Sequence, residues 1–300
     1  MKEPIGVLLA AGLGTRLRPL TLVRPKPLVP LHGIPLLEFG LRQLRQAGCR
    51  LIAVNGHHLR EAVQTWLQAR AADGGLDLRF FAEPDLLGVG GGLARMAREL
   101  PPGPLLVQNG DVLHDGELGR LLERARGAEV ALALGGEPRV VECPAGRVLG
   151  LRDPARSTHG FTGIHVWSEA ARERLCAWTR PDLIPFFQAE AAAGRDIRGV
   201  ALAADGTGAL WEDLGRLERY LPLHRELWEN GAYRRLLDRL ELAPRWDAER
   251  ALSLGERSLL PEDARNCVAW EGVRWQGEAR DSVFLDGVQG RGLVAGEIVL

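Results

Sequence analysis

Lysine is scarce in this chain of 300 residues. Of its 38 basic side chains only Lys2 and Lys26 are lysine, and the other 36 are arginine. A planar guanidinium cannot replace a compact, mobile ammonium group everywhere, so an arginine-rich chain keeps lysine where an ammonium is needed. Lys26 stands between Pro25 and Pro27, which stiffen the backbone around it. Lys26 is therefore the first candidate for a functional residue.

An excess of one charge, paired cysteines and long apolar runs are also lacking. The 38 basic and 39 acidic residues give a net charge of −1, which argues against a nucleic-acid partner or an acidic membrane surface. The four cysteines show no CxxC or metal-ligand spacing, as expected for reduced, buried thiols. No apolar run approaches the roughly 18 residues of a membrane span. We therefore expect a cytoplasmic protein without a membrane partner.

Short apolar runs alternate with amphipathic stretches through most of the chain. Strands are expected at residues 5–9, 51–54, 76–81, 105–107, 161–167 and 197–203, and helices at 36–47, 59–70, 88–100, 169–177, 183–193 and 217–228. Such alternation is typical of βα units that build a mostly parallel sheet. The glycine-punctuated stretch 129–166 has the pattern of antiparallel hairpins. We therefore expect an α/β fold with a mixed, mostly parallel sheet.

The pattern of charged, apolar and glycine residues changes after Pro244. Residues 266–273 (Asn-Cys-Val-Ala-Trp-Glu-Gly-Val) resemble residues 281–288 (Asp-Ser-Val-Phe-Leu-Asp-Gly-Val), fifteen positions later. This repeat predicts either stacked β turns of a small solenoid or two similar hairpin strands. We divide the chain into a core of residues 1–243 and a β-rich C-terminal extension of residues 244–300. The extension is a candidate for homo-oligomer contacts or for a cap on the core.

A glycine-containing loop follows the first expected strand. The dinucleotide pattern GxGxxG fails because Leu17 stands where the third glycine belongs, and no Walker Gly-Lys-Ser/Thr occurs in the chain. Gly12 and Gly14 nevertheless let the backbone approach a bulky ligand. Thr15 and Arg16 follow directly, in position to meet phosphate oxygens. The loop therefore predicts a phosphate-binding site.

The stretch from Gly12 to Thr21, followed by Pro25-Lys26-Pro27, reads G-x-G-T-R-L-x-P-L-T and P-K-P. This pattern closely resembles the signature of the sugar-1-phosphate nucleotidyltransferases, and above all their short bacterial members. The resemblance covers residues 1–230, with Asn109-Gly110-Asp111, residues 161–164 (Phe-Thr-Gly-Ile) and residues 211–215 (Trp-Glu-Asp-Leu-Gly) in the family's order. It implies a Rossmann-like core and a reaction in which an NTP and a sugar-1-phosphate give an NDP-sugar and pyrophosphate.

The resemblance also implies roles for individual residues. Arg16 and Lys26 are the catalytic candidates because two anions must be brought together and their charge offset. Asp111 and Asp213 are the expected ligands of Mg²⁺, which prefers carboxylate oxygens. The expected nucleotide contacts are Ala10, Ala11, Gly12, Gly14, Thr15, Glu83, Gly88 and Gly91. The expected sugar-phosphate contacts are Asn109, Thr162 and Gly163.

One segment departs from the family. Many relatives carry Glu-Lys-Pro before the sugar-side strand, whereas this chain has Arg152-Asp153-Pro154. Either Arg152 contacts phosphate from a shifted loop or that contact is missing, so the sequence does not identify the sugar. It does not identify the base either, because backbone groups can select a base without a distinctive side chain. Two alternatives to the enzyme are a non-catalytic nucleotide-sugar sensor on the same fold and a metal-dependent glycosyltransferase.

Overall fold

A computed structural model of the chain describes residues 2–72, 75–153, 155–202 and 210–300. It contains two compact units, which are Met1–Leu13 with Phe39–Asp213, and Gly14–Glu38 with Leu214–Leu300. The domain boundary expected between residues 243 and 244 lies inside the second unit. The division into domains 1–243 and 244–300 stays a prediction. Pro154 and residue 203, which ends the strand expected at 197–203, lie outside the described residues.

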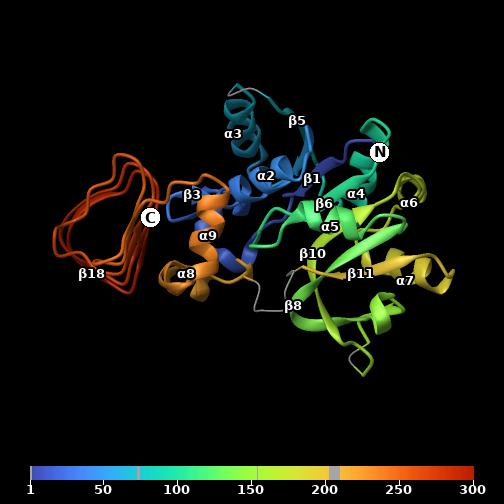
Figure 1. Ribbon diagram of the computed structural model, residues 1–300. Coiled ribbons are helices and arrows are strands. Elements are labelled where there is room, and N and C mark those ends of the chain that lie inside the picture. Colours follow the sequence, from blue (N-terminus) through green and yellow to red (C-terminus); the bar gives the residue numbers. More distant parts are fainter. Residues whose placement is uncertain (1, 73–74, 154, 203–209) are drawn as a thin grey trace. The chain divides into compact units, whose positions relative to one another are not determined.

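The first unit is built on a mixed sheet that has eight strands in the described part of the chain (Figure 1). Their order is β11 (Ile197–Ala201), β8 (Val130–Glu142), β10 (His159–Trp167), β6 (Leu105–Asn109), β1 (Ile5–Leu9), β4 (Leu51–Gly56) and β5 (Asp77–Ala82), with β9 (Gly150–Leu151) on β8. Strand β1 is parallel to β4 and β6, and β4 to β5. Strand β10 is antiparallel to β6 and β8. The expected α/β fold is confirmed.

The direction of the winding changes at β1. The chain runs from β1 to β4 and β5 on one side, and then returns to β6 on the other side of β1. In open α/β sheets, ligands bind beyond the carboxyl ends of the strands at such a reversal. Leu9 at the end of β1 is the register partner of Asn109 at the end of β6. The loops that follow these two residues therefore leave the sheet at the same point.

The helices of this part of the chain are α2 (Leu36–Gln46), α3 (Arg60–Ala72), α4 (Gly88–Glu99), α5 (Leu118–Arg124), α6 (Glu169–Leu175) and α7 (Ile184–Ala192). Helix α5 was not expected from the sequence. Trp167 of β10 packs against Phe186 and Phe187 of α7, with ring centroids 5.2 and 5.5 Å apart, and all three side chains are buried. Aromatic contacts of this kind bury large apolar areas and fix α7 on the sheet.

A buried arginine closes the C-terminal end of α4. The Arg172 guanidinium donates hydrogen bonds to the carbonyl oxygens of Ala97, Leu100, Pro101 and Gly103, at 2.6–3.1 Å. The last carbonyl groups of a helix lack partners inside the helix, so a cation with several donors is well suited to this position. Arg172 of α6 therefore ties the end of α4 to the following turn.

The second unit combines an early segment with the C-terminal part of the chain. Its elements before residue 240 are η1 (Thr15–Leu17), α1 (Leu20–Val23), η2 (Lys26–Leu28), β2 (Pro30–Leu31), β3 (Ile34–Pro35), α8 (Leu217–Glu229) and α9 (Gly231–Arg239). His32, in the turn between β2 and β3, is fully buried, and burial lowers its pKa to about 3. Its neutral ring donates from Nε2 to the His224 carbonyl and accepts at Nδ1 from the Tyr233 hydroxyl. These bonds join the turn to α8 and α9.

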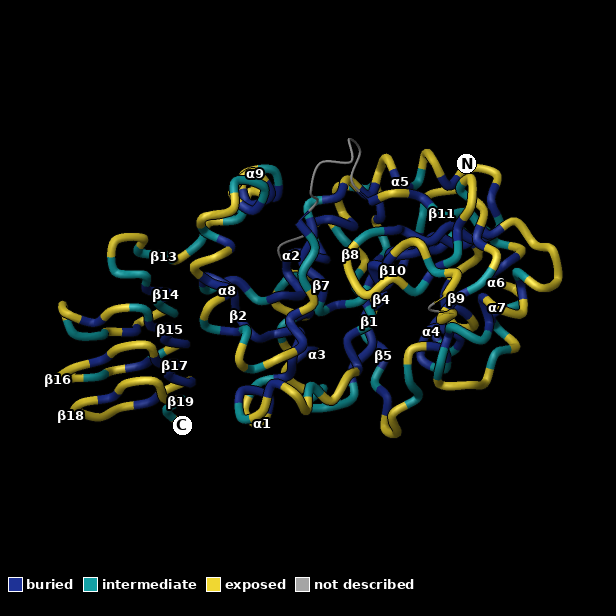
Figure 2. Tube along the Cα trace, turned by 90° about the horizontal axis from the view of Figure 1, so that it is seen from below, coloured by how far each residue is buried: buried dark blue, intermediate teal, exposed yellow. Residues whose placement is uncertain are grey.

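The C-terminal strands form a solenoid. They are β13 (Trp246–Asp247), β14 (Leu252–Leu254), β15 (Cys267–Ala269), β16 (Arg274–Arg280), β17 (Val283–Phe284), β18 (Gln289–Ala295) and β19 (Ile298–Val299). Parallel partners lie fifteen residues apart, as in Leu252 with Cys267 and Val283 with Ile298. Figure 2 shows β14, β15, β17 and β19 stacked one on another. Of the two readings of the repeat, stacked turns are correct and paired hairpin strands are not.

Local backbone geometry repeats with the same period. Ala251, Asn266, Asp281 and Gly296 all have φ between 50° and 72°, so each coil turns at a left-handed residue in the same place. Asparagine, aspartate and glycine are the residues that tolerate this conformation best. The buried side chains of Phe284 and of its register partner Ala269 in the preceding coil belong to one apolar cluster inside the stack. Each coil thus covers the apolar face of the next.

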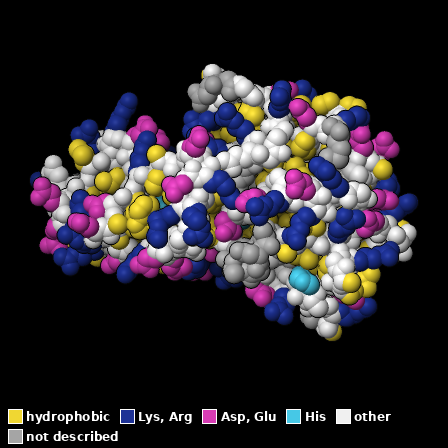
Figure 3. All heavy atoms as spheres, in the orientation of Figure 1, with side chains coloured by type: hydrophobic (Ala, Val, Ile, Leu, Met, Phe, Trp, Pro, Cys, Tyr) yellow, Lys and Arg dark blue, Asp and Glu magenta, His cyan; other side chains and the backbone are white. Residues whose placement is uncertain are grey.

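Charges are mixed over the surface. Figure 3 shows basic and acidic side chains interspersed on the face that it draws, in keeping with a net charge of −1. In the described part of the chain, no helix combines the length and the apolar character that crossing a bilayer requires. The cysteines Cys49, Cys143 and Cys267 are buried free thiols, as expected, whereas Cys176 is half-buried.

Replacing Arg172 by Met should destabilise the first unit. The substitution keeps the apolar stem but removes every donor to the four carbonyl groups at the end of α4. A buried polar group left without a partner costs about 1–3 kcal/mol, so we expect a loss of about 3 kcal/mol or more in urea unfolding. Arg79→Met is the matched control, because Arg79 pairs with Asp77 at the surface and such pairs contribute about 1 kcal/mol or less. Equal losses in the two variants would contradict the role of Arg172.

Candidate active site

The loops after β1 and β6 begin side by side. The Gly110 amide donates to the Leu9 carbonyl at 2.9 Å, which continues the strand pairing by one residue. Ala10 and Ala11 follow Leu9 and are buried. Gly12 is exposed, and a Cβ built on it would meet no atom within 4 Å. The backbone at Gly12 therefore has open space beside it, and its contact with a ligand stays a prediction.

A buried amide links this loop to Glu83. Asn55, at the end of β4, accepts a hydrogen bond from the Ala10 amide at 2.7 Å and donates to Glu83 Oε1 at 2.7 Å. The other carboxylate oxygen of Glu83 accepts from the Leu87 amide at 3.2 Å. Asn55 and Glu83 are 3% and 1% exposed, so these bonds are shielded from water. The Asn55–Glu83 bridge therefore joins the first loop to the turn before α4.

Asn55 is the residue that sequence reasoning missed. It stands one position after the strand expected at 51–54. Its signal is a polar side chain at the carboxyl end of a buried parallel strand, where ligand-binding groups of α/β proteins gather. Asn55 belongs to no recognised motif, and only the fold shows that its amide reaches Ala10 and Glu83.

The glycines at the start of α4 allow close packing at some positions and leave the backbone accessible at another. Gly88 has φ of 71°, and a Cβ built on it would lie 2.6 Å from Pro181. A Cβ on Gly92 would lie 2.5 Å from Glu83 Oε1. Gly91 is half-exposed, and a Cβ there would approach only Leu87 of the preceding turn. The close neighbours of Gly88 and Gly92 account for glycine at those positions, whereas Gly91 keeps an accessible face.

Asn109 and Gly163 lie against each other. Gly163 has φ of 78°, and a Cβ built on it would be 2.5 Å from Asn109 Nδ2, so only glycine leaves room for that amide. Thr162 is buried, and its hydroxyl donates to the Ala133 carbonyl and accepts from the Ile164 amide. The Thr162 side chain thus has its partners within the sheet. Of the three expected sugar-side residues, the fold brings Asn109 and Gly163 together.

Asp111 directly precedes one of two short strands that pair, and Asp213 ends the other. Strand β7 (Val112–His114) is antiparallel to β12 (Trp211–Asp213), and Asp213 is the register partner of Val112. Asp111, which directly precedes Val112, is half-buried and Asp213 is exposed. About a hundred residues of sequence separate these two carboxylates, yet the ladder sets Asp213 opposite the residue that follows Asp111. In the described part of the chain, no group of three or more His, Cys, Asp or Glu side chains is arranged to hold a metal.

The signature segment of the second unit folds back on itself. Gly14 has φ of 62°, and a Cβ built on it would lie 2.8 Å from Thr21 Cγ2 and 3.2 Å from Lys26 Cβ. The Thr21 hydroxyl donates to the Gly14 carbonyl at 2.8 Å. The first half of the motif therefore packs on the stem of Lys26. Glycine is required at position 14 both by its backbone conformation and by this close approach.

The two cationic candidates differ in exposure. Arg16, in η1, is exposed, as is its neighbour Thr15. Lys26, in η2, is 8% exposed. Burying an ammonium group is costly unless it gains partners, so a buried lysine in a chain with two lysines marks a constrained position. Arg16 therefore offers a guanidinium at the surface of the second unit and Lys26 an ammonium that is held more rigidly.

Arg152, which stands where the family has Glu-Lys-Pro, is engaged by another side chain. Its guanidinium donates to Asp182 Oδ2 at 2.7 Å, and its own φ is 61°. The side chain is more than half exposed. The ion pair with Asp182 supplies a partner for Arg152 within the protein, and contact with phosphate stays a prediction.

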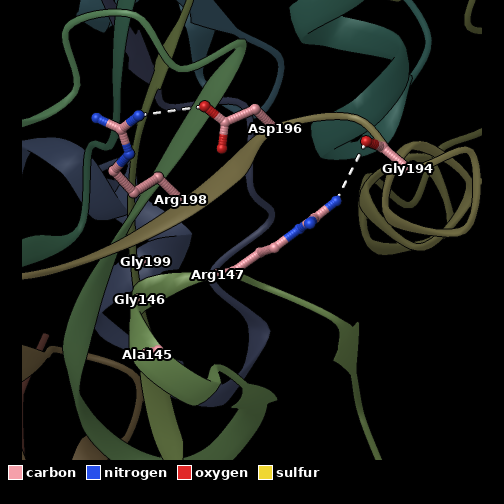
Figure 4. Close-up of a pocket in the computed structure, with 7 residues that line it drawn as sticks. All are labelled: Ala145, Gly146, Arg147, Gly194, Asp196, Arg198 and Gly199. Carbon is pink, nitrogen blue, oxygen red and sulfur yellow. Dashed lines mark hydrogen bonds and ion pairs between the residues drawn. The ribbon is translucent and has the colours of Figure 1, made fainter.

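A separate pocket of about 430 Å³ lies beside β8 and β11 (Figure 4). It is lined by Ala145, Gly146, Arg147, Gly194, Asp196, Arg198 and Gly199. Arg147 donates to the Gly194 carbonyl, and Arg198 donates to Asp196 and to the carbonyls of Arg124 and Arg126. None of the residues that the family resemblance implies lines this pocket, and both of its cations already have partners. We do not assign the active site to it.

Comparisons with known proteins agree with the motif. Residues 5–142 match the family model described as Nucleotidyl transferase. The mannose-1-phosphate guanylyltransferase of Mycobacterium tuberculosis is 40% identical over 144 residues, which are 46% of this chain and 39% of that protein. The N-acetylmuramate alpha-1-phosphate uridylyltransferase of Neisseria meningitidis is 40% identical over 110 residues, which are 36% of this chain and 47% of that protein. The resemblance found in the sequence is confirmed.

Other similarities extend further along the chain. The UTP–glucose-1-phosphate uridylyltransferase of Synechocystis is 28% identical over 249 residues, which are 71% of this chain and 61% of that protein. The chain thus spans between 39% and 61% of the lengths of these three curated relatives. The crystal structure of HddC from Yersinia pseudotuberculosis matches 74% of this chain and 99% of that chain, with a TM-score of 0.60 at 18% identity. This last similarity shows a common fold.

Two substitutions at Asn55 should behave differently with pH. Asn55→Leu leaves the Ala10 amide and a Glu83 oxygen without partners, so we expect a loss of about 1–3 kcal/mol that is nearly independent of pH between 5 and 8. Asn55→Asp sets a second carboxylate against Glu83, and like charges raise a carboxyl pKa in the folded state. The folded variant then binds more protons than the unfolded chain, so its deficit should be largest near pH 8 and shrink toward pH 5. Urea unfolding at several pH values measures both, and parallel pH curves would refute the bridge.

Proposed function

Since residues 5–142 match the family model of the nucleotidyl transferases, we propose that this chain transfers a nucleoside monophosphate from an NTP to a sugar-1-phosphate. The products are an NDP-sugar and pyrophosphate. The observation that carries the proposal is the folding of the complete signature, in which Gly14 packs on the stem of Lys26. The relatives' names support both halves of the reaction, because each names a sugar-1-phosphate and a guanylyl or uridylyl group.

The reaction needs positioning and positive charge more than acid–base groups. An oxygen of the sugar phosphate attacks the α-phosphorus of the NTP in line, a new P–O bond forms, and the bond to the β-phosphate breaks to release pyrophosphate. The attacking oxygen is already ionised, so no general base is required. We assign the planar fork of Arg16 to the leaving β- and γ-phosphates. Lys26 is assigned to the α-phosphate or the incoming sugar phosphate, where negative charge accumulates.

We propose Asp111 and Asp213 as the protein's ligands for Mg²⁺. Their hard carboxylate oxygens suit this ion, which commonly takes one or two carboxylates and completes its shell with phosphate and water. The pairing of β7 with β12 supports a shared site because it sets Asp213 opposite the residue after Asp111. When bound, Mg²⁺ would offset the negative charge of the phosphate groups of the NTP.

The remaining assignments concern the base, the sugar and the cell. Gly12 and Gly91, whose backbone is accessible, are proposed to leave room for the nucleotide. Asn109 and Gly163 are proposed to contact the sugar phosphate. The proposed roles of Ala10, Ala11, Gly14, Thr15, Glu83, Gly88 and Thr162 follow the family pattern. GTP with mannose-1-phosphate and UTP with glucose-1-phosphate are the first pairs to test, because relatives are named for them. We also propose a cytoplasmic location and subunit contacts through residues 244–300.

Lys26→Ala should nearly abolish the reaction. We expect pyrophosphate release from a panel of NTPs and sugar-1-phosphates to fall by about 100-fold or more, as for the loss of one charge-stabilising donor. Lys2→Ala is the matched control, since it removes the other lysine, which pairs with Glu169 at the surface. Circular dichroism should show both variants folded. Near-normal turnover of Lys26→Ala would refute its role, and binding of NDP-sugar without any pyrophosphate release by the native chain would favour a sensor.

Asp111→Asn and Asp213→Asn should each weaken Mg²⁺ binding. In calorimetric titration with a non-hydrolysable NTP analogue present, we expect the apparent Mg²⁺ affinity to fall by about 10-fold or more, because a carboxylate is lost from the ion's shell. Asp77→Asn, which changes an exposed carboxylate paired with Arg79, serves as the control. An unchanged affinity in both test variants would remove these residues from the metal site.

A further inference from the structure

The C-terminal solenoid forms an ion pair with the signature segment just before Lys26. Arg24 donates from Nε and Nη2 to the carboxylate of Asp286, at 3.1 and 2.6 Å. Asp286 follows β17 in the solenoid and lies 262 residues further along the chain. Its Oδ1 also accepts from the Glu271 amide of the preceding coil at 3.1 Å. The carboxylate is thereby fixed to two coils. It accepts two hydrogen bonds from the Arg24 guanidinium, which gives that guanidinium a defined orientation.

A buried tryptophan supports the same arginine from its other side. The Arg24 guanidinium lies over the ring of Trp270, 4.9 Å from its centroid. Trp270 is 1% exposed, and its backbone amide donates to the Phe284 carbonyl in the coil that carries Asp286. A guanidinium on an aromatic face is attracted by the ring, more strongly where water is excluded. The Arg24 side chain is 17% exposed, so it is largely enclosed by Asp286 and Trp270.

The same tryptophan reaches the other side of Lys26 through Tyr220. Trp270 Nε1 donates to the Tyr220 hydroxyl at 2.9 Å, and that hydroxyl donates to the Pro30 carbonyl at 2.7 Å. Tyr220, in α8, is buried, and burial raises its pKa, so the hydroxyl keeps the proton that it donates. Residues 24 and 30 are thus both attached to Trp270, and Lys26 lies between them.

We propose that Asp286 is a positioning residue for Lys26, acting through Arg24 with Trp270 as support. Pro25 and Pro27 limit the backbone around the lysine, so a displacement at Arg24 is passed on to its ammonium group. A misplacement of about 1 Å in a catalytic group can cost about 100-fold in rate. The proposal rests on the catalytic role proposed for Lys26. It makes the solenoid part of the catalytic apparatus.

Asp286→Ala tests the proposal by two readouts. In steady-state kinetics of pyrophosphate release, we expect kcat to fall at least about 10-fold with a smaller change in KM, because the interaction of Lys26 is made in the transition state. The second readout needs no activity. Acetylation by an amine-reactive ester, followed by peptide mass spectrometry, should show Lys26 modified faster than in the native chain, with Lys2 as the internal reference.

Asp281→Ala is the matched control. Asp281 lies in the same coil and accepts from the Asn266 side chain fifteen residues earlier, whereas the side-chain hydrogen bonds of Arg24 go to Asp286. It should leave kcat and the Lys26 acetylation rate unchanged. The exchanged pair Arg24→Asp with Asp286→Arg should recover part of both readouts, which loss of solenoid stability alone would not do. If Asp286→Ala fails to fold, Asp286→Asn takes its place, since it keeps the acceptor for the Glu271 amide.

The outcomes separate the two proposals. Native kcat and native Lys26 acetylation in Asp286→Ala would overturn the positioning role. A third outcome is that the native chain releases no pyrophosphate with any substrate pair, while Asp286→Ala still makes the acetylation of Lys26 faster. That outcome would support the positioning of Lys26 by Asp286 and refute the proposed reaction. Reduced kcat with an unchanged acetylation rate, and no recovery in the exchanged pair, would also overturn the positioning role.

Discussion

The pairing of β1 with β6 is the constraint on which the first unit depends. These two parallel strands are fully embedded in the sheet, and the winding reverses between them. Because Leu9 and Asn109 are register partners, the loop with Ala10 to Gly12 and the turn with Asp111 start from the same edge. Three further groups of the candidate site in this unit contact that edge or the residues next to it. Asn55 holds Ala10, Gly163 receives Asn109, and β12 pairs with the strand after Asp111.

The second unit has to hold in place an early segment that is rich in proline. Residues 14–38 have short helical turns and little regular pairing of their own. Their order comes from side chains of the C-terminal part, through Tyr220 to Pro30, Tyr233 to His32 and Asp286 to Arg24. These contacts close loops of 190 to 262 residues, and the entropic cost of closure grows only slowly with loop length. A solenoid late in the sequence can therefore fix an early segment of the chain.

Much of the fold was predictable because it depends on local periodicity. The buried strands, the helices that follow them and the fifteen-residue repeat of the extension all leave a pattern within a few neighbouring residues. Helices α5 and α9 were missed because they are short, at seven and nine residues. The repeat alone did not choose between hairpins and a solenoid, since both bury the same alternating side chains. The parallel register of Leu252 with Cys267 makes that choice.

The sequence by itself determined the chemistry that the chain can offer. It supplies one proline-flanked lysine among 36 arginines, a glycine loop with the family signature, and carboxylates after the expected strands. The tertiary structure decided which of many identical side chains are placed to act. Arg24, Arg152 and Arg172 are alike in sequence, yet one is clamped by Asp286, one pairs with Asp182 and one ends a helix. The reason is that a side chain's role depends on neighbours brought close by long-range folding, and local sequence does not record those neighbours.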